Sequence, residues 1–157
     1  MKKITQLLIL GILAFGLAAC GTTGSTGGDT TTGGTGGDSG VSGRSLDKDL
    51  LSRKLIHFEY NSAEIDDESR RIIEAHANHL NGKSIRIRLE GHADERGTRE
   101  YNLSLGERRA NAVAKIMRAL GVEGSRIKKV SFGEEKPLRK GHNEAAWSMN
   151  RRVEIAY

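Results

Sequence analysis

From about residue 46 onward, the chain alternates between two periods of hydrophobic and polar residues. Apolar side chains recur at every second position in four short segments, which is typical of half-buried strands. Between these segments they recur every three or four positions, which is typical of amphipathic helices. The four strand segments contain Ile56, Phe58 and Tyr60; Ile85, Ile87 and Leu89; Val130 and Phe132; and Val153, Ile155 and Tyr157. The two helical stripes contain Ile65, Ser69, Ile72, His76 and Leu80, and then Leu105, Ala112, Ile116 and Leu120.

Capping residues mark the expected ends of the second helix. Ser104 with Glu107 three residues later has the pattern of a capping box, so we expect this helix to follow a loop over residues 95–103. Gly121 follows Leu120 at the position where a glycine ends many helices. A third, short helix is expected near residues 143–149, just before the last strand.

The predicted order of elements is β-α-β-α-β-(α)-β, which indicates an α+β fold. We expect a two-layer sandwich, with helices packed on one face of a mixed four-stranded sheet, over residues 46–157. A domain of this size buries a working but small core. The polar residues between the apolar strand positions would then lie on the exposed face of the sheet. They are Arg86, Arg88, Glu90, Arg152 and Glu154.

The start of the chain has the pattern of an export signal. Two lysines precede an apolar run over residues 7–19, which is shorter than the roughly 20 residues of a membrane-spanning helix. We therefore expect residues 1–19 to be a signal peptide. Leu17-Ala18-Ala19-Cys20 resembles a bacterial lipoprotein signal, which implies cleavage before Cys20, which then carries the acyl chains. The alternative is an ordinary signal peptide with a cysteine near the cut by chance.

A polar segment separates Cys20 from the predicted domain. Every residue from 21 to 43 except Val41 is Gly, Thr, Ser or Asp. Such a composition buries too little apolar surface to offset the entropy of ordering, so residues 20–45 are expected to be a lipidated, disordered tether. A flexible segment of this length has an end-to-end distance of roughly 24 to 29 Å.

The formal net charge of +5 raises the question of a nucleic-acid partner. The export signal argues against one. The basic residues are also interleaved with acidic residues rather than clustered, and only 4% of the residues are aromatic, which leaves few rings for base stacking. We therefore expect no nucleic-acid binding.

The candidate chemistry lies in residues 91–113, which read GHADERGTREYNLSLGERRANAV. Asp94 follows the second strand, and Arg109 lies on the following helix. If the intervening loop folds back, the two opposite charges border a polar notch. An ammonium would donate to Asp94 and a carboxylate on the same carbon would accept a fork from Arg109.

This run closely resembles the signature of the OmpA-like C-terminal domain family, and more narrowly that of the peptidoglycan-associated lipoproteins (Pal) of Gram-negative cells. Asn150-Arg151-Arg152-Val153 also matches the end of the family pattern. Two residues depart from the pattern. The family often has threonine at the position of Ala93 and an acid at the position of Asn61. The resemblance implies a set of peptidoglycan-binding residues. They are Asp94, Arg109, Asn102, Tyr60, Asn61, Ala93, Arg96 and Leu105.

The resemblance also implies a ligand, partners and a location. The ligand would be the meso-diaminopimelate of the peptidoglycan stem peptide, bound non-covalently and without a cofactor. The protein would be lipid-anchored in the outer membrane with its domain in the periplasm, and Gly21 after Cys20 fits that location. It would join the Tol-Pal system of envelope integrity and cell division, with TolB and other Tol proteins as partners.

Two other functions and a metal site are the alternatives. One is a peptidoglycan-cleaving enzyme that uses Asp94 or Glu95 with a second carboxylate, although nothing identifies that second group. The other is a scaffold whose main partner is a periplasmic protein. His92 beside Asp94 raises the possibility of a zinc site, which needs three or four protein ligands. Only His76 and His79 are spaced to lie on one side of a helix, so we expect no metal. Common hydrolase and nucleotide-binding motifs are absent.

Overall fold

The computed structural model describes residues 39–157. The predicted signal peptide, Cys20 and the tether up to residue 38 lie outside the described residues. The described elements occur in the following order along the chain. They are α1 (Ser39–Ser52), β1 (Leu55–His57), α2 (Asp67–Leu80), β2 (Ile87–His92), α3 (Arg99–Ala119), a 3₁₀ turn (Gly124–Arg126), β3 (Ile127–Gly133), α4 (Glu144–Asn150) and β4 (Arg152–Ala156).

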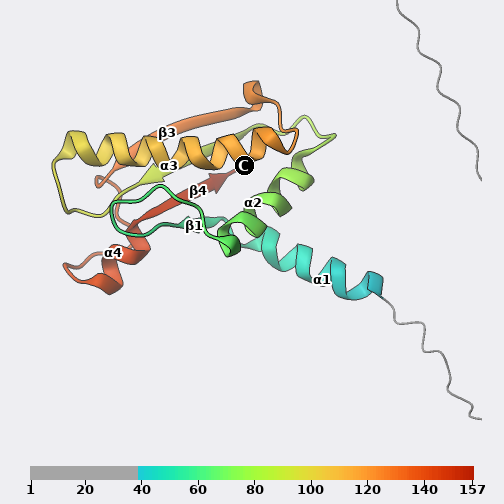
Figure 1. Ribbon diagram of the computed structural model, residues 1–157, viewed down its shortest axis with the longest axis horizontal. Coiled ribbons are helices and arrows are strands. Elements are labelled where there is room, and N and C mark those ends of the chain that lie inside the picture. Colours follow the sequence, from blue (N-terminus) through green and yellow to red (C-terminus); the bar gives the residue numbers. More distant parts are fainter. Residues whose placement is uncertain (1–38) are drawn as a thin grey trace, which may run out of the picture. The chain divides into compact units, whose positions relative to one another are not determined.

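The four strands form one mixed sheet in the order β1-β4-β2-β3 (Figure 1). β2 runs parallel to β3, whereas β4 pairs antiparallel with both β2 and β1. A parallel pair needs a long crossover connection, and α3 supplies it between β2 and β3. The predicted α+β sandwich with a mixed four-stranded sheet is confirmed.

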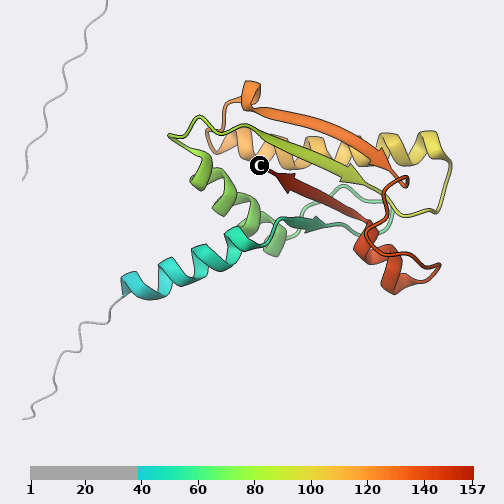
Figure 2. The same ribbon diagram turned by 180° about the vertical axis from the view of Figure 1, so that it is seen from behind.

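The helices α2 and α3 cover one face of the sheet, which lies behind them in Figure 1 and in front of them in Figure 2. Alternate residues of β2 and β4, such as Leu89 and Ile155, point into the core beneath these helices. Ile72 and Leu80 of α2 and Met117 of α3 meet them there. Within residues 39–157, no helix has the length and apolar character needed to cross a bilayer.

The predicted start of α3 is wrong. The helix begins at Arg99, because Thr98 is its N-cap and accepts a hydrogen bond from the backbone N–H of Tyr101. Ser104, the predicted cap, lies inside the helix and accepts from Arg108 instead. A serine followed by a glutamate three residues later occurs both at N-caps and inside helices, so the pattern alone does not distinguish the two positions. The C-terminal end is as predicted, with Gly121 at a φ of 96°.

The predicted buried stripe of α3 is also displaced. Of its members Leu105 is buried, while Ala112, Ile116 and Leu120 are only half-buried. The face turned to the sheet instead carries Asn102, Gly106, Arg109, Val113 and Met117. Two polar residues and a glycine on that face hide its apolar periodicity. The stripe of α2 is confirmed for Ser69, Ile72, His76 and Leu80.

Three further predictions differ from the structure. Helix α1 begins at Ser39, so residues 39–45 of the predicted disordered tether are helical, and Leu50 on α1 packs against the core. The first strand ends at His57, which leaves Tyr60 in a loop. Arg152, expected to be exposed on the open face, is buried, and it donates to the backbone carbonyls of Asn150 and Lys136.

Candidate functional site

Two glycines set the position of the site by bringing α3 directly onto β2. A Cβ added to Gly91 would lie 1.9 Å from the carbonyl oxygen of Gly106, and one added to Gly106 would lie 2.8 Å from that of Gly91. Neither position therefore accepts a side chain without moving the helix. Because α3 packs this closely on β2, the residues just after β2 lie against α3.

Asp94 is the acid at the end of β2, and it is only 4% exposed. Its Oδ1 accepts from the backbone N–H of Arg96 at 3.0 Å and from Arg96 Nε at 3.2 Å. Its Oδ2 accepts from Arg96 Nη2 at 2.7 Å and from Arg151 Nη1 at 3.4 Å. Burial opposes ionisation, but the hydrogen bonds and charge of Arg96, with Arg151, lower the pKa of Asp94 below its ordinary 3.8. Asp94 is therefore a carboxylate at neutral pH.

Arg96 covers Asp94 from the solvent side. Its guanidinium lies between two aromatic rings, 4.0 Å from the centroid of Tyr60 and 4.1 Å from that of Trp147. A guanidinium stacked on an aromatic face gains about 0.5–2 kcal/mol. The Arg96 side chain nevertheless remains 29% exposed. The Arg96 side chain thus covers Asp94 and is itself held only by contacts with other side chains.

Arg109 lies on the inner side of the same acid and has no exposed surface. It donates to three backbone carbonyls: Nε to Ser62 at 2.8 Å, Nη1 to His92 at 2.7 Å and Nη2 to Glu59 at 3.0 Å. Burial lowers the pKa of Arg109 to about 10, with partial compensation from the charge of Asp94, so it stays cationic at neutral pH. Arg109 therefore joins three chain segments instead of standing free at a notch, as the sequence had suggested.

Arg151 completes a group that we call the Asp94 cluster: Asp94, Arg96, Arg109 and Arg151. Arg151 is buried and donates to the carbonyl of Phe58 at 3.0 Å and to Glu144 at 2.6 Å, besides Asp94. The sequence offered one weak sign of this role, because strand alternation puts Arg151 on the helix side of β4. Glu144 and Trp147 had no such sign, since α4 reaches the site only through the tertiary fold.

The remaining predicted site residues divide into exposed and buried groups. Tyr60 is 56% exposed, and Asn61 is exposed and accepts a hydrogen bond from the Tyr101 hydroxyl. The other three are buried. They are Ala93, Leu105 and Asn102, whose amide donates to Glu134. The structure therefore brings Arg96 into contact with both Tyr60 and Asp94, whereas Asn102 and Leu105 are buried on α3.

Two clefts open beside the cluster. One of about 530 Å³ is lined by Arg151, Phe58 and Ser62 together with acidic residues of the loop after β1. Another of about 300 Å³ is lined by Ala93 and by Glu95, which accepts from Trp147 and His142. Neither Asp94 nor Arg96 lines either cleft.

Of the histidines considered for zinc, His76 and His79 lie one turn apart on α2, and His92 lies apart from both on β2. His76 is buried in the core, where its ring nitrogens contact the Tyr157 hydroxyl and, at 2.9 Å, the carbonyl of Arg53. His79 is half-buried near the C-terminal end of the same helix, beside Lys83. His92 lies on the face of the sheet away from the helices, and its ring stacks on Phe132.

The chain matches the OmpA family over residues 57–151, which is more than half of its length. The chain belongs to this family. A peptidoglycan-associated lipoprotein from Pasteurella multocida is 41% identical over 159 residues, covering 100% of this chain and 100% of the relative. One from Pseudomonas aeruginosa is 48% identical over 99 residues, covering 63% of this chain but only 59% of that protein. The resemblance predicted from residues 91–113 is confirmed.

Solved structures agree with this membership. The crystal structure of the peptidoglycan-associated lipoprotein from Burkholderia pseudomallei has a TM-score of 0.67 and 38% identity, covering 69% of this chain and 92% of that one. The OmpA-like domain of FopA1 from Francisella tularensis has a TM-score of 0.59 and 27% identity, covering 66% and 69%. The four-stranded mixed sheet of this OmpA family member is therefore shared with these relatives.

Proposed function

We propose that this protein binds peptidoglycan non-covalently through the zwitterionic end of meso-diaminopimelate in the stem peptide. The observation that carries the proposal is the Asp94–Arg96 pair, a buried carboxylate closed by one partly exposed guanidinium. The ligand has an ammonium and a carboxylate on one carbon, which match the two charges of the pair. The relatives named peptidoglycan-associated lipoproteins support the cell wall as the source of the ligand.

Binding in this proposal is an exchange of partners. The ligand ammonium replaces the Arg96 guanidinium on Asp94, and Arg96 takes the ligand carboxylate as it swings away. The stacking contacts with Tyr60 and Trp147 must be lost or re-formed in this step. Because two ion pairs replace one internal pair, the net gain is a small number of charge-assisted hydrogen bonds, each contributing about 1.5–3 kcal/mol. Such a gain suits reversible attachment.

Arg109 and Arg151 keep their places during this exchange. Their hydrogen bonds to backbone carbonyls position the loop after β1 against the end of β2. Their positive charges favour a carboxylate nearby and keep Asp94 ionised. The 530 Å³ cleft beside Arg151 has room for the neighbouring residues of the stem peptide.

A wall-cleaving enzyme is not supported by this geometry. A general acid for glycoside hydrolysis needs a raised pKa, whereas the pKa of Asp94 is lowered. The neighbouring carboxylate, Glu95, accepts hydrogen bonds from Trp147 and His142, and its pKa is also lowered. We therefore propose a binding role without catalysis.

The proposed setting is the outer membrane. Acylation at Cys20 would anchor the protein there, and the residues that follow would let the domain reach the wall from the periplasmic side. Tethering raises the local concentration of the domain at the wall, so a modest affinity suffices. Membership of the Tol-Pal system, with TolB as a partner, is proposed on the resemblance of residues 91–113 to the peptidoglycan-associated lipoproteins.

The test compares two kinds of peptidoglycan. Lysine equals diaminopimelate without the terminal carboxylate, so walls with lysine in the stem keep the ammonium and lose the acid. The detergent-solubilised mature protein should co-sediment with diaminopimelate-type sacculi, and more weakly with lysine-type sacculi. Asp94→Asn should weaken binding to both. Arg99→Gln is the matched control, because Arg99 lies on the surface paired with Glu135.

Equal binding of Asp94→Asn and the unmodified protein would overturn the assignment of the ammonium site. Equal binding to the two wall types would overturn the role of the ligand carboxylate. Release of soluble wall fragments during prolonged incubation would instead favour the enzyme.

A further inference from the structure

His92 is a buried side chain without a hydrogen-bond partner. It is 1% exposed, and neither ring nitrogen contacts a donor or acceptor among the described residues. Buried polar groups are nearly always hydrogen-bonded, because an unpaired group loses its interactions with water and gains nothing in return. His76, the other buried histidine of the described chain, contacts partners through both nitrogens. His92 therefore lacks the usual features of a core histidine.

The backbone directs the His92 side chain onto the face of the sheet that α2 and α3 do not cover. The pairing of β2 with β3 shifts between Gly91 and His92, so that Gly91 lies opposite Ser131 and His92 opposite Gly133. Such irregularities change the direction of the side chain that follows and occur next to functional sites. The ring ends on the face opposite to α3, on the same side as Glu90.

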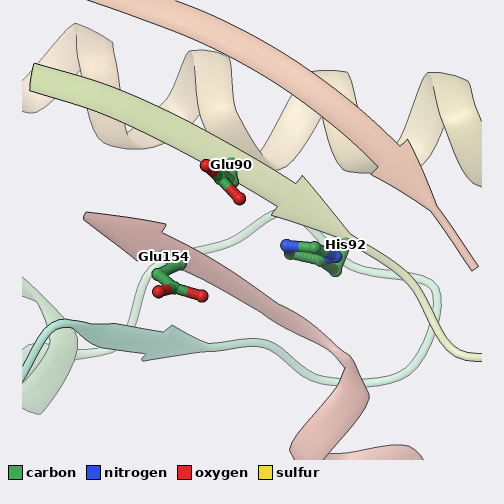
Figure 3. Close-up of side chains that lie close together, drawn as sticks. All are labelled: Glu90, His92 and Glu154. Carbon is green, nitrogen blue, oxygen red and sulfur yellow. The ribbon is translucent and has the colours of Figure 1, made fainter. Parts of the chain in front are cut away.

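Two carboxylates meet His92 on that face. Glu90 on β2 lies directly opposite Glu154 on β4 in the antiparallel pairing, so their side chains project together. One ligand atom from each of Glu90, His92 and Glu154 lies within 4.8 Å of the other two (Figure 3). Both carboxylates are half-buried. We call these three residues the His92 cluster.

We propose that the His92 cluster binds a divalent transition-metal ion, with Zn²⁺ as the best match. One imidazole nitrogen and two carboxylate oxygens are ligands that zinc accepts, and three protein ligands leave a fourth position for water. Zinc bonds of about 2.1 Å in a tetrahedron place ligand atoms about 3.4 Å apart. The two glutamates reach that spacing by rotating their flexible side chains, while His92 stays held against Phe132 at a ring-centroid distance of 5.5 Å.

Three cations near the cluster tune its affinity. Arg88 donates to Glu90, so the metal must compete with it for that carboxylate. The charges of Arg152 and Lys136 both act on His92 and disfavour additional positive charge. Lys136 is exposed and lies over the Phe132 ring at 3.7 Å. These cations predict a weaker site than an isolated histidine–carboxylate set, and they predict that Lys136→Gln strengthens binding.

The experiment is a Zn²⁺ titration of the detergent-solubilised mature protein by calorimetry, with Co²⁺ absorption as a second readout of tetrahedral coordination. The unmodified protein should bind one ion and gain thermal stability as zinc is added. His92→Gln and Glu154→Gln should each weaken binding at least about tenfold. His79→Gln is the matched control and should bind as the unmodified protein does, because His79 lies on α2.

The wall-binding assay reports on folding independently. His92→Gln should retain binding to sacculi while losing zinc, and Asp94→Asn should lose sacculi while retaining zinc. The two proposals can therefore fail independently: a wrong wall assignment would not affect the metal assignment, and a wrong metal assignment would not affect the wall assignment. Saturable zinc binding that is unchanged in His92→Gln and Glu154→Gln would overturn the proposal, and so would the absence of saturable binding in the unmodified protein.

Discussion

His92 and Asp94 are two residues apart in the chain, yet the clusters named after them differ in how many of their buried polar groups form hydrogen bonds. Both oxygens of Asp94 and every side-chain nitrogen of Arg109 and Arg151 take part in hydrogen bonds. In the His92 cluster, both nitrogens of the buried imidazole lack partners among the described residues. The polar groups of one cluster are paired within the protein, whereas the other contains a buried ring that the described residues leave unpaired.

The difference separates two ways of preparing a binding site. In the Asp94 cluster a protein cation already occupies the proposed ligand position, so binding replaces one ion pair by others, and the Asp94 carboxylate is already desolvated before the ligand arrives. In the His92 cluster a ligand would satisfy groups that folding leaves unpaired, so binding should add directly to stability. Four predictions break or sharpen this comparison.

The largest effect is expected for Arg109→Ala. Three backbone carbonyls lose their donor, and that of His92 is left buried without a partner at a cost of about 1–3 kcal/mol. Removal of the fully buried Arg109 side chain also leaves a cavity, so the free energy of unfolding should fall by about 3 kcal/mol in all. Urea unfolding measures this change. Arg108→Ala, one position away on the exposed side of α3, should change stability by under about 0.5 kcal/mol. Equal midpoints for the two variants would show that Arg109 does not hold the cluster.

The second effect is on wall binding through Asp94→Asn. Loss of the charged acceptor removes a hydrogen bond that contributes about 1.5–3 kcal/mol, so affinity for diaminopimelate-type sacculi should fall roughly ten- to hundredfold. Because the pKa of Asp94 lies below 3.8, binding by the unmodified protein should be constant from pH 5 to 8 and weaken only in stronger acid. A steep loss between pH 7 and 5 would contradict the assignment of Asp94.

The third effect concerns acid stability and the His92 cluster. Burial first, and then the charges of Arg152 and Lys136, lower the pKa of His92 from 6.5 to about 4. The unfolded chain therefore binds this proton at higher pH than the folded chain, and stability falls as pH decreases from 6.5 towards 4. In the presence of a chelator, this group should lower the unfolding free energy by about 2 kcal/mol between pH 7 and 5.

His92→Gln tests this cause, because the variant should lose that part of the pH dependence. His76, whose pKa burial also lowers, supplies a further part that remains in the variant. Urea unfolding at the two pH values measures both contributions. An unchanged pH dependence in His92→Gln would show that the His92 ring is hydrated or paired in solution.

The smallest effect is expected for Arg96→Gln. This change removes the proposed partner of the ligand carboxylate but also frees Asp94, so the two consequences partly cancel. We expect a loss of about tenfold or less with diaminopimelate-type sacculi and little change with lysine-type sacculi. The preference between wall types is therefore the decisive measurement. A variant that keeps the full preference would place the carboxylate on another arginine.

Much of the fold followed from local patterns in the sequence. Strand alternation located the central β2 and β4, and the period of α2 identified Ile72, His76 and Leu80 as buried. Gly121 marked the end of α3 because a positive φ favours glycine. The run around Asp94 identified the family and its candidate acid. These features depend on neighbours in the chain, which a sequence displays directly.

Tertiary structure alone decided the roles of the buried polar residues. Nothing local shows that Arg109 donates to Glu59 and Ser62, that α4 brings Glu144 and Trp147 to Asp94, or that Glu154 lies opposite Glu90. A charged side chain is stable inside a protein only when distant segments supply its partners, and those partners are set by strand register and helix packing. The sequence determined which charges this protein carries and where its strands and helices run. The fold determined which of those charges meet.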